Sequence, residues 1–170
     1  AASDAVFLGD ATQIHQVLAN LLRNAAEAIG EAGTIRVRVE VVAVDESMAT
    51  RHPPMHVGRY VCIEVADSGS GIDAATQARL FEPFFTTKPY GQGTGLGLAV
   101  VYGIVREHDG VIVVHSGAGD GTTFRVYLPA CDAKAERPFA TAIEPTDAAA
   151  TGARTKRVLF VDDQSYVANL

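Results

Sequence analysis

The chain has 170 residues, of which 48% are hydrophobic and 20% are charged, and its formal net charge is −6 at pH 7. This length suits one ordinary domain with a short appendage. The apolar content excludes an intrinsically disordered protein, and two cysteines are too few for a small secreted protein held by disulfides. The acidic balance argues against nucleic acid as a partner, so a bound phosphate needs a local site.

The sequence also argues against a membrane-spanning or exported chain. No apolar run approaches the roughly 18 residues of a membrane-spanning helix, and the start AASDAVFLGD lacks a signal-peptide pattern. We therefore expect a cytoplasmic domain with no direct membrane contact. Cys62 and Cys131 have no CxxC or Cys/His partner nearby, which favours two free thiols over a disulfide or a zinc site.

The predicted elements follow one another as helix, strand, strand, helix, helix, strand, strand. Apolar residues at helical spacing and alternating apolar residues give their positions. In chain order they are a helix over 12–29, a strand over 34–44, a polar loop over 47–58, a strand over 60–66, a short helix over 74–82, a helix over 98–108, and strands over 111–115 and 122–128. This order favours an α+β fold with helices on one face of a sheet.

The composition changes after Pro129. Residues 131–154 are rich in alanine and have no sustained period, which predicts a linker. Residues 155–170 begin again like a buried strand that ends in Asp162 and Asp163. The sequence thus predicts a main domain over 1–130, a linker over 131–154 and the start of another unit over 155–170.

Three segments could carry chemistry, and the first is the helix over 12–29. Gln16, Asn20 and Asn24 are spaced i, i+4 and i+8, so they form a polar stripe flanked by Arg23 and Glu27. The stripe is either an ordinary solvated face or a set of amide oxygens for a magnesium ion shared with phosphates.

The second segment is VADSGSGID, in which a strand delivers Asp67 to its carboxyl end. Gly69 and Gly71 then allow a tight turn and a close approach to a ligand. Asp67 could accept a hydrogen bond from an exocyclic amine. An ordinary aspartate-glycine turn is the alternative.

The third segment is GQGTGLGLAVV, where glycines alternate and lead directly into a helix at Leu98. Such a loop exposes backbone N–H groups beside the positive end of the helix dipole, which suits a phosphate. It is neither a Walker loop nor a dinucleotide fingerprint. Lys88 and Thr94 could add side-chain donors, although a loop lysine can also simply be solvated.

Together these segments resemble the ATP-binding domain of sensor histidine kinases. HQVLANLLRNAAEAI resembles its asparagine box, DSGSGI and GTGLGL its two glycine boxes, and LFEPFFTTK its phenylalanine box. The resemblance covers roughly residues 6–130. It implies a Bergerat fold, a two-layer sandwich of a mixed sheet with helices on one face, as in gyrase, Hsp90 chaperones and mismatch-repair ATPases.

The resemblance implies ATP and Mg²⁺ as cofactors. Asn24 would be the magnesium ligand, Asp67 would bind the adenine amino group, and Thr122 would reach the adenine through a water. Residues 84–97 would cover the triphosphate as a lid, anchored by Phe81 and Phe84. The expected nucleotide-binding residues are Asn20, Arg23, Asn24, Asp67, Gly69, Gly71, Ile72, Lys88, Gly93, Thr94, Gly95, Leu96, Gly97, Leu98 and Thr122.

The resemblance also implies which reaction follows ATP binding. In the hydrolysing relatives a glutamate one turn before the magnesium asparagine activates water, whereas this chain has Asn20, and an amide cannot accept that proton. We therefore expect transfer of the γ-phosphoryl group to another nucleophile. An ATP-binding module without transfer activity and a Bergerat ATPase are the alternatives.

The acceptor histidine is expected outside this chain. In the family it lies on a dimerising two-helix hairpin, and none of the five histidines here fits it. His52 and His56 have metal-like spacing, but without partner ligands a zinc site is disfavoured. KRVLFVDD resembles the start of a receiver domain. The expected partners are therefore the protein's own hairpin and receiver, in a homodimeric hybrid kinase of which this chain is a monomeric piece.

Overall fold

The computed structural model describes residues 5–88 and 93–132. Its main sheet has the order β2-β3-β5-β4, formed by β2 (Ile35–Val44), β3 (Gly58–Asp67), β5 (Thr122–Pro129) and β4 (Val111–Ser116). Every neighbouring pair of these four strands is antiparallel. The predicted α+β class is confirmed, but the expected mixed sheet is wrong for the described strands. The predicted linker beyond Asp132 and the receiver-like tail lie outside the described residues.

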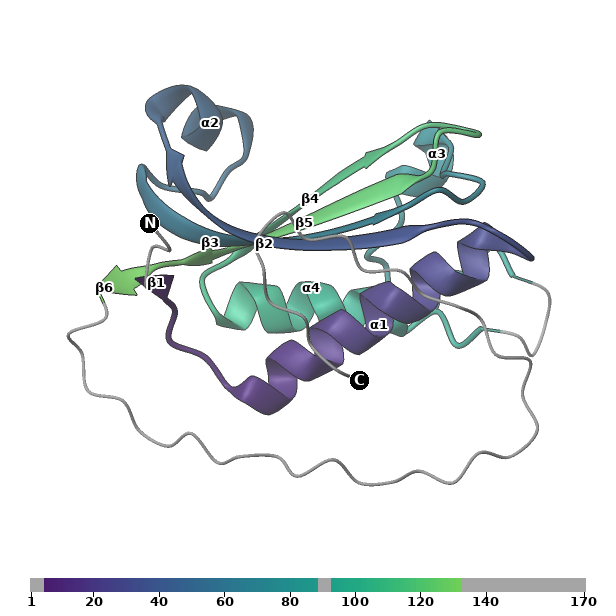
Figure 1. The fold of residues 1–170 in the computed structure, drawn as a ribbon, viewed down its shortest axis with the longest axis horizontal. Helices are drawn as coiled ribbons and strands as arrows, with labels where there is room; N and C mark the ends of the chain where they lie inside the picture. The colour runs from purple at the N-terminus through teal and green to yellow at the C-terminus, as the bar shows by residue number, and fades with distance from the viewer. Residues whose placement is uncertain (1–4, 89–92, 133–170) are drawn as a thin grey trace.

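Two long helices, α1 (Ala11–Ile29) and α4 (Gly97–Glu107), lie side by side on one face of this sheet (Figure 1). Asp10 starts α1, because its carboxylate accepts a hydrogen bond from the Thr12 backbone N–H at 2.7 Å. The main core fills the space between helices and sheet, and full burial of one such side chain contributes roughly 1.5–3 kcal/mol. Its fully buried members include Val17, Leu21, Val65, Val101, Val105, Val126 and Leu128.

A short helix, α2 (Glu46–Arg51), lies against the opposite face of the sheet (Figure 1). The predicted loop over 47–58 is therefore wrong at its beginning. Asp45 caps α2 by accepting from the Met48 N–H at 2.8 Å, and Met48 and Ala49 pack against a second buried cluster. The members of that cluster are Val44, Met55, Tyr60, Cys62, Val111, Val113 and Tyr127.

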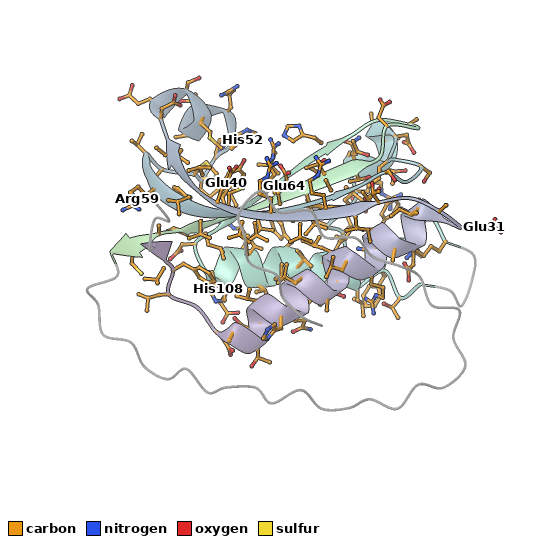
Figure 2. The ribbon with its side chains drawn as sticks, viewed as in Figure 1. Glu31, Glu40, His52, Arg59, Glu64 and His108 are labelled. Atoms are coloured by element: carbon orange, nitrogen blue, oxygen red, sulfur yellow. The ribbon has the colours of Figure 1, made fainter. Side chains whose placement is uncertain are left out.

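Charged side chains occupy the part of this second face that α2 leaves open. Glu40 and Glu64 both lie there (Figure 2), and Glu64 accepts a hydrogen bond from Arg125 Nε at 2.7 Å. Cys62 lies buried on the same face, opposite Glu40 in the β2–β3 register, and burial raises the pKa of its thiol to about 11. Cys62 is therefore protonated at neutral pH and is a poor nucleophile.

Two smaller features complete the described fold. The helix α3 (Ala74–Gln77), capped by Asp73, is shorter than the predicted 74–82. A two-stranded sheet pairs β1 (Ala5–Val6) with β6 (Cys131–Asp132), so the first two residues of the predicted linker form a strand. Cys131 and Cys62 are both free thiols, as predicted.

Candidate functional site

A cleft of about 690 Å³ lies beside α1, at the carboxyl end of β3 and the amino end of α4. Its lining includes all the predicted nucleotide-binding residues except Asn20, Gly69 and Leu96. The three segments singled out in the sequence thus line one cavity, although the first and the last are more than 60 residues apart in the chain. Ser70, Asp73, Thr76, Leu80, Phe85, Thr86, Thr87 and Phe124 also line it.

Asp67, the last residue of β3, is held in place by backbone donors. Its Oδ1 accepts hydrogen bonds from the N–H groups of Gly69 at 2.8 Å and Thr122 at 3.3 Å. Burial raises the pKa of this carboxyl group above its ordinary value, and the two N–H donors oppose the rise only in part. A half-buried carboxylate in such a position is a strong acceptor for a ligand N–H group.

The glycines that follow Asp67 are required by close backbone packing. A Cβ atom on Gly71, whose φ is 70°, would lie 1.8 Å from the Gly117 carbonyl oxygen. A Cβ on Gly69 would lie 2.7 Å from the carbonyl oxygen of Ala28 on α1. Gly69 lies outside the lining of the cleft, and its role is to let the turn approach α1 closely.

A hydrogen-bond network that sequence reasoning missed ties this turn to the β4–β5 hairpin. The Ile72 N–H donates to Ser116 Oγ at 2.8 Å, and Ser116 Oγ in turn donates to the Gly121 carbonyl oxygen at 2.8 Å. Because a serine hydroxyl has one proton, Thr122 Oγ1, at 2.9 Å, must donate to Ser116. The oxygen of Thr122 keeps its acceptor capacity.

Gln77, also missed, closes the network from α3. Its Nε2 donates to the backbone carbonyl groups of Ile72 at 2.7 Å and Ser116 at 3.0 Å. No local pattern could have identified Ser116 or Gln77, because neither forms part of a motif and their partners lie up to 44 residues away.

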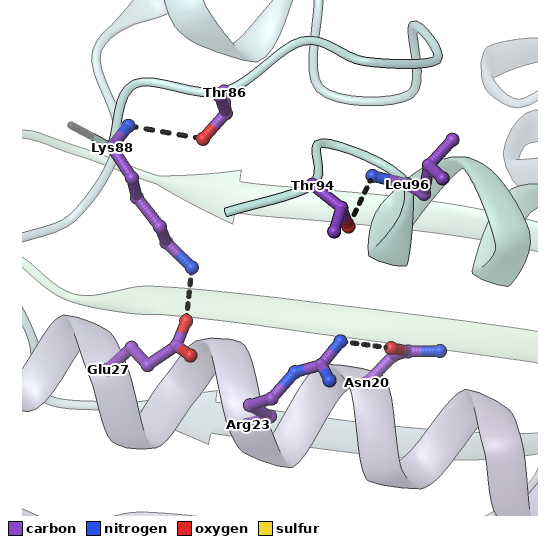
Figure 3. Close-up of polar contacts among 7 residues, drawn as sticks. All are labelled: Asn20, Arg23, Glu27, Thr86, Lys88, Thr94 and Leu96. Carbon is purple, nitrogen blue, oxygen red and sulfur yellow. Dashed lines mark hydrogen bonds and ion pairs between the residues drawn. The ribbon is translucent and has the colours of Figure 1, made fainter. Parts of the chain in front are cut away.

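The other end of the cleft is built on the polar stripe of α1 (Figure 3). Asn20 Oδ1 accepts from Arg23 Nη2 at 2.7 Å, and Asn20 Nδ2 donates to the Gln16 carbonyl at 3.0 Å. A Cβ on Gly97 would lie 3.3 Å from both Asn20 Oδ1 and Arg23 Nη2. The stripe therefore faces the amino end of α4. Asn20 itself does not line the cleft, but it contacts Arg23, which does.

The amino end of α4 has no side-chain cap. The first N–H groups of a helix lack partners within the helix, and Gly97 and Leu98 at this end line the cleft. Thr94 Oγ1 lies 3.4 Å from the Leu96 N–H, whereas the Leu96 side chain is 38% exposed and points away from the lining. This arrangement favours an anion at the α4 end.

Lys88 reaches across the cleft to α1, where its Nζ forms an ion pair with Glu27 (Figure 3). Its backbone N–H donates to Thr86 Oγ1 at 3.1 Å. Lys88, one of the predicted nucleotide-binding residues, lies in the lining of the cleft. Glu27 was noted only as a flanking residue of the stripe, and its pairing with Lys88 was not predicted.

The two expected lid anchors behave differently. Phe81 packs against Tyr102 of α4, with ring centroids 5.2 Å apart. Phe84 is 75% exposed, so its prediction as an apolar anchor is wrong. Its φ of 66° and the 3.0 Å hydrogen bond from its N–H to the Gly95 carbonyl turn the side chain toward solvent. The neighbouring Phe85 lines the cleft instead, beneath the guanidinium of Arg79.

Comparison with known proteins agrees with this geometry. Residues 9–132 match the family described as histidine kinase-, DNA gyrase B- and HSP90-like ATPase. The chain belongs to this family. It is 37% identical over 161 residues to the sensor kinase CckA of Brucella abortus, covering 93% of this chain and 17% of CckA. It is 45% identical over 120 residues to the sensor histidine kinase ZraS of Escherichia coli, covering 71% of this chain and 22% of ZraS.

Among solved structures, the catalytic domain of the histidine kinase ThkA superimposes with a TM-score of 0.55 at 35% identity, over 72% of this chain and 70% of that domain. The chain therefore spans most of a kinase catalytic domain but less than a quarter of either curated relative. Within residues 5–88 and 93–132, no helix combines the length and apolarity needed to cross a bilayer.

Proposed function

We propose that this domain binds ATP together with Mg²⁺ and presents the γ-phosphoryl group to a histidine on a separate two-helix hairpin of the same protein. The observation that carries the proposal is the convergence of a half-buried carboxylate, Asp67, and an uncapped helix amino end at Gly97 on one cleft. The first group suits an amine, the second suits a phosphate, and ATP contains both.

At the adenine end, ionised Asp67 would accept a hydrogen bond from the adenine amino group. Thr122 Oγ1, which keeps its acceptor capacity, would hold a water beside the base. Gly71 and Ile72 would form the wall of the base pocket. Since Asp67 is itself fixed by two backbone N–H groups, it would be ready to bind the base without rearrangement.

The residues at the phosphate end fit a magnesium ion. Asn24 lines the cleft, and within the described part of the chain its amide group forms no hydrogen bond, so its oxygen is available. Mg²⁺ prefers oxygen ligands and usually binds through one or two protein oxygens together with substrate phosphates and water. When bound, the ion supplies neutralisation of the phosphate charge. Gly93, Gly95 and Gly97 would donate backbone N–H groups, while Arg23, Lys88 and Thr94 would add side-chain donors.

Phosphoryl transfer is favoured over hydrolysis by the chemistry of Asn20. Its amide oxygen accepts from Arg23 and its amide nitrogen donates to Gln16, so it has neither the basicity nor the freedom to activate a water. None of the described residues that line the cleft is a histidine. The acceptor would therefore come from another part of the protein, a hairpin in a cytoplasmic homodimeric sensor kinase, with a receiver domain as a further partner.

Two measurements test this function. Isothermal titration of the chain with ATP and Mg²⁺ should show one site, and Asp67→Asn should weaken its affinity about tenfold to a hundredfold. Radiolabel from γ-labelled ATP should then appear on the hairpin histidine of the full-length protein. Binding without labelling would support a regulatory module in place of a kinase, and steady ATP hydrolysis without an acceptor would support an ATPase.

A further inference from the structure

The ion pair between Lys88 and Glu27 connects opposite walls of the cleft. Glu27 belongs to α1, whereas Lys88 belongs to the segment that follows the phenylalanine box, 61 residues later. Both residues line the cleft, where the side chain of Lys88 is 37% exposed and that of Glu27 is 43% exposed. Glu27 is thus a carboxylate at the end of the cleft where Arg23, Lys88 and the amino end of α4 suit a polyanion.

The pair lies away from the amino end of α4 (Figure 3). That helix end packs against Asn20 and Arg23. Glu27 follows Asn20 by seven residues, which corresponds to about 10 Å along the axis of α1. As a result, the ammonium group of Lys88 is held by Glu27 at a distance from the helix N–H groups that favour an anion.

The stem of Lys88 runs beside Gly93. A Cβ on Gly93 would lie 3.1 Å from Lys88 Cδ and 3.0 Å from Thr86 Oγ1, so glycine at this position leaves room for the lysine. The four-carbon stem of a lysine is flexible. Its ammonium group can therefore exchange partners within the cleft without movement of the backbone.

We propose that Glu27 sets the affinity of the cleft for phosphate by holding Lys88 on α1, and that a triphosphate draws this lysine away from Glu27. The inference rests on the proposed function. A carboxylate and a phosphate compete for the same ammonium group, and a half-exposed ion pair contributes little enough to be exchanged. Glu27 opposes binding twice, because it retains Lys88 and because its charge repels the phosphates once the lysine has left.

The test compares charge-matched variants by isothermal titration of the full chain with ATP and Mg²⁺. Glu27→Gln should tighten ATP binding about two- to fivefold. Glu31→Gln removes the same charge just beyond the end of α1 and outside the cleft (Figure 2), so it should leave the affinity unchanged. Adenosine, which has no phosphate, should bind wild type and Glu27→Gln equally. Circular dichroism checks folding, and Glu27→Ala replaces the glutamine variant if that variant does not fold.

A double-mutant cycle with Lys88→Met separates competition from simple repulsion. Without Lys88 only the direct repulsion by Glu27 remains, so the gain from Glu27→Gln should be smaller in that background. An equal gain in both backgrounds, or an unchanged or weaker affinity of Glu27→Gln, overturns the inference while leaving the proposed function intact. Absence of ATP binding by the wild-type chain overturns the proposed function and this inference with it.

Discussion

The two ends of the cleft are held together in different ways. At the end near Asp67, the polar groups are fixed by backbone hydrogen bonds and by a buried Thr122, which is only 3% exposed. At the end near Glu27 and Lys88, side chains pair with one another, Lys88 with Glu27 and Arg23 with Asn20. The difference indicates that the first end supplies shape and selectivity, whereas the second supplies charge that can be redistributed.

The largest effect is expected on the free energy of unfolding, when a methyl group is added to the turn at the Asp67 end of the cleft. Gly71→Ala adds a Cβ at a positive φ and within 1.8 Å of the Gly117 carbonyl oxygen, so it should lower the free energy of unfolding by about 3 kcal/mol or more. Chemical denaturation measures this loss. The matched control is Gly103→Ala at an exposed position of α4, where a Cβ meets nothing within 4 Å and should stabilise by about 0.5–1 kcal/mol. Similar effects of both changes would contradict a rigid turn at Gly71.

The second effect concerns ligand selectivity at the same end. Asp67→Asn keeps an oxygen for the N–H groups of Gly69 and Thr122 but replaces a carboxylate oxygen by an amide NH₂ group. A charge-assisted hydrogen bond is worth roughly 1.5–3 kcal/mol, so ATP affinity should fall about tenfold to a hundredfold. Calorimetry measures the affinity, and wild-type affinity in this variant would remove Asp67 from the site.

At the phosphate end, Asn24→Ala should weaken binding by about tenfold, and the loss should depend on Mg²⁺. Titrations of ATP with Mg²⁺ and with excess chelator check this. If Asn24 holds the ion, wild type and variant should differ with Mg²⁺ and converge in chelator. An equal loss in both conditions would assign Asn24 to the nucleotide and not to the metal.

The smallest effect is on stability and pH. Burial raises the pKa of Asp67 in the folded protein, so ionised Asp67 destabilises the fold at neutral pH. Asp67→Asn should therefore raise Tm by on the order of 2 °C at pH 7. As pH falls through the raised pKa, wild-type Asp67 becomes protonated and the difference in Tm should shrink. A difference that grows toward acid pH would show that the carboxylate stabilises the free protein.

The long helices and strands of this fold could be predicted because the spacing of their apolar residues matches the face that each element buries. Apolar positions such as Val17 and Leu21 on α1 recur at helical spacing and face the sheet. The helix α2 could not be predicted in the same way. Its six residues depend on the cap at Asp45 and on packing of Met48 against a cluster formed by distant strands.

Site residues that belong to a local motif could be predicted from the sequence. Site residues that act through contacts with distant parts of the chain could not. Asp67 and Gly97 belong to glycine-containing motifs whose backbone demands are local. Ser116 and Glu27, in contrast, act through partners 44 and 61 residues away, which no local pattern records. The exposure of Phe84 was missed for a related reason, since its apolar side chain predicts burial while its backbone conformation prevents it.

The small sheet of β1 and β6 has a mechanical consequence. Because Ala5 pairs with Asp132 and Val6 with Cys131, the chain enters and leaves the described domain side by side. Tension applied through residues 5 and 132 would separate β1 from β6 one residue pair at a time, before the main sheet came under load. Two residue pairs are thus the first contacts that such a load would break, and none of their four residues lines the cleft.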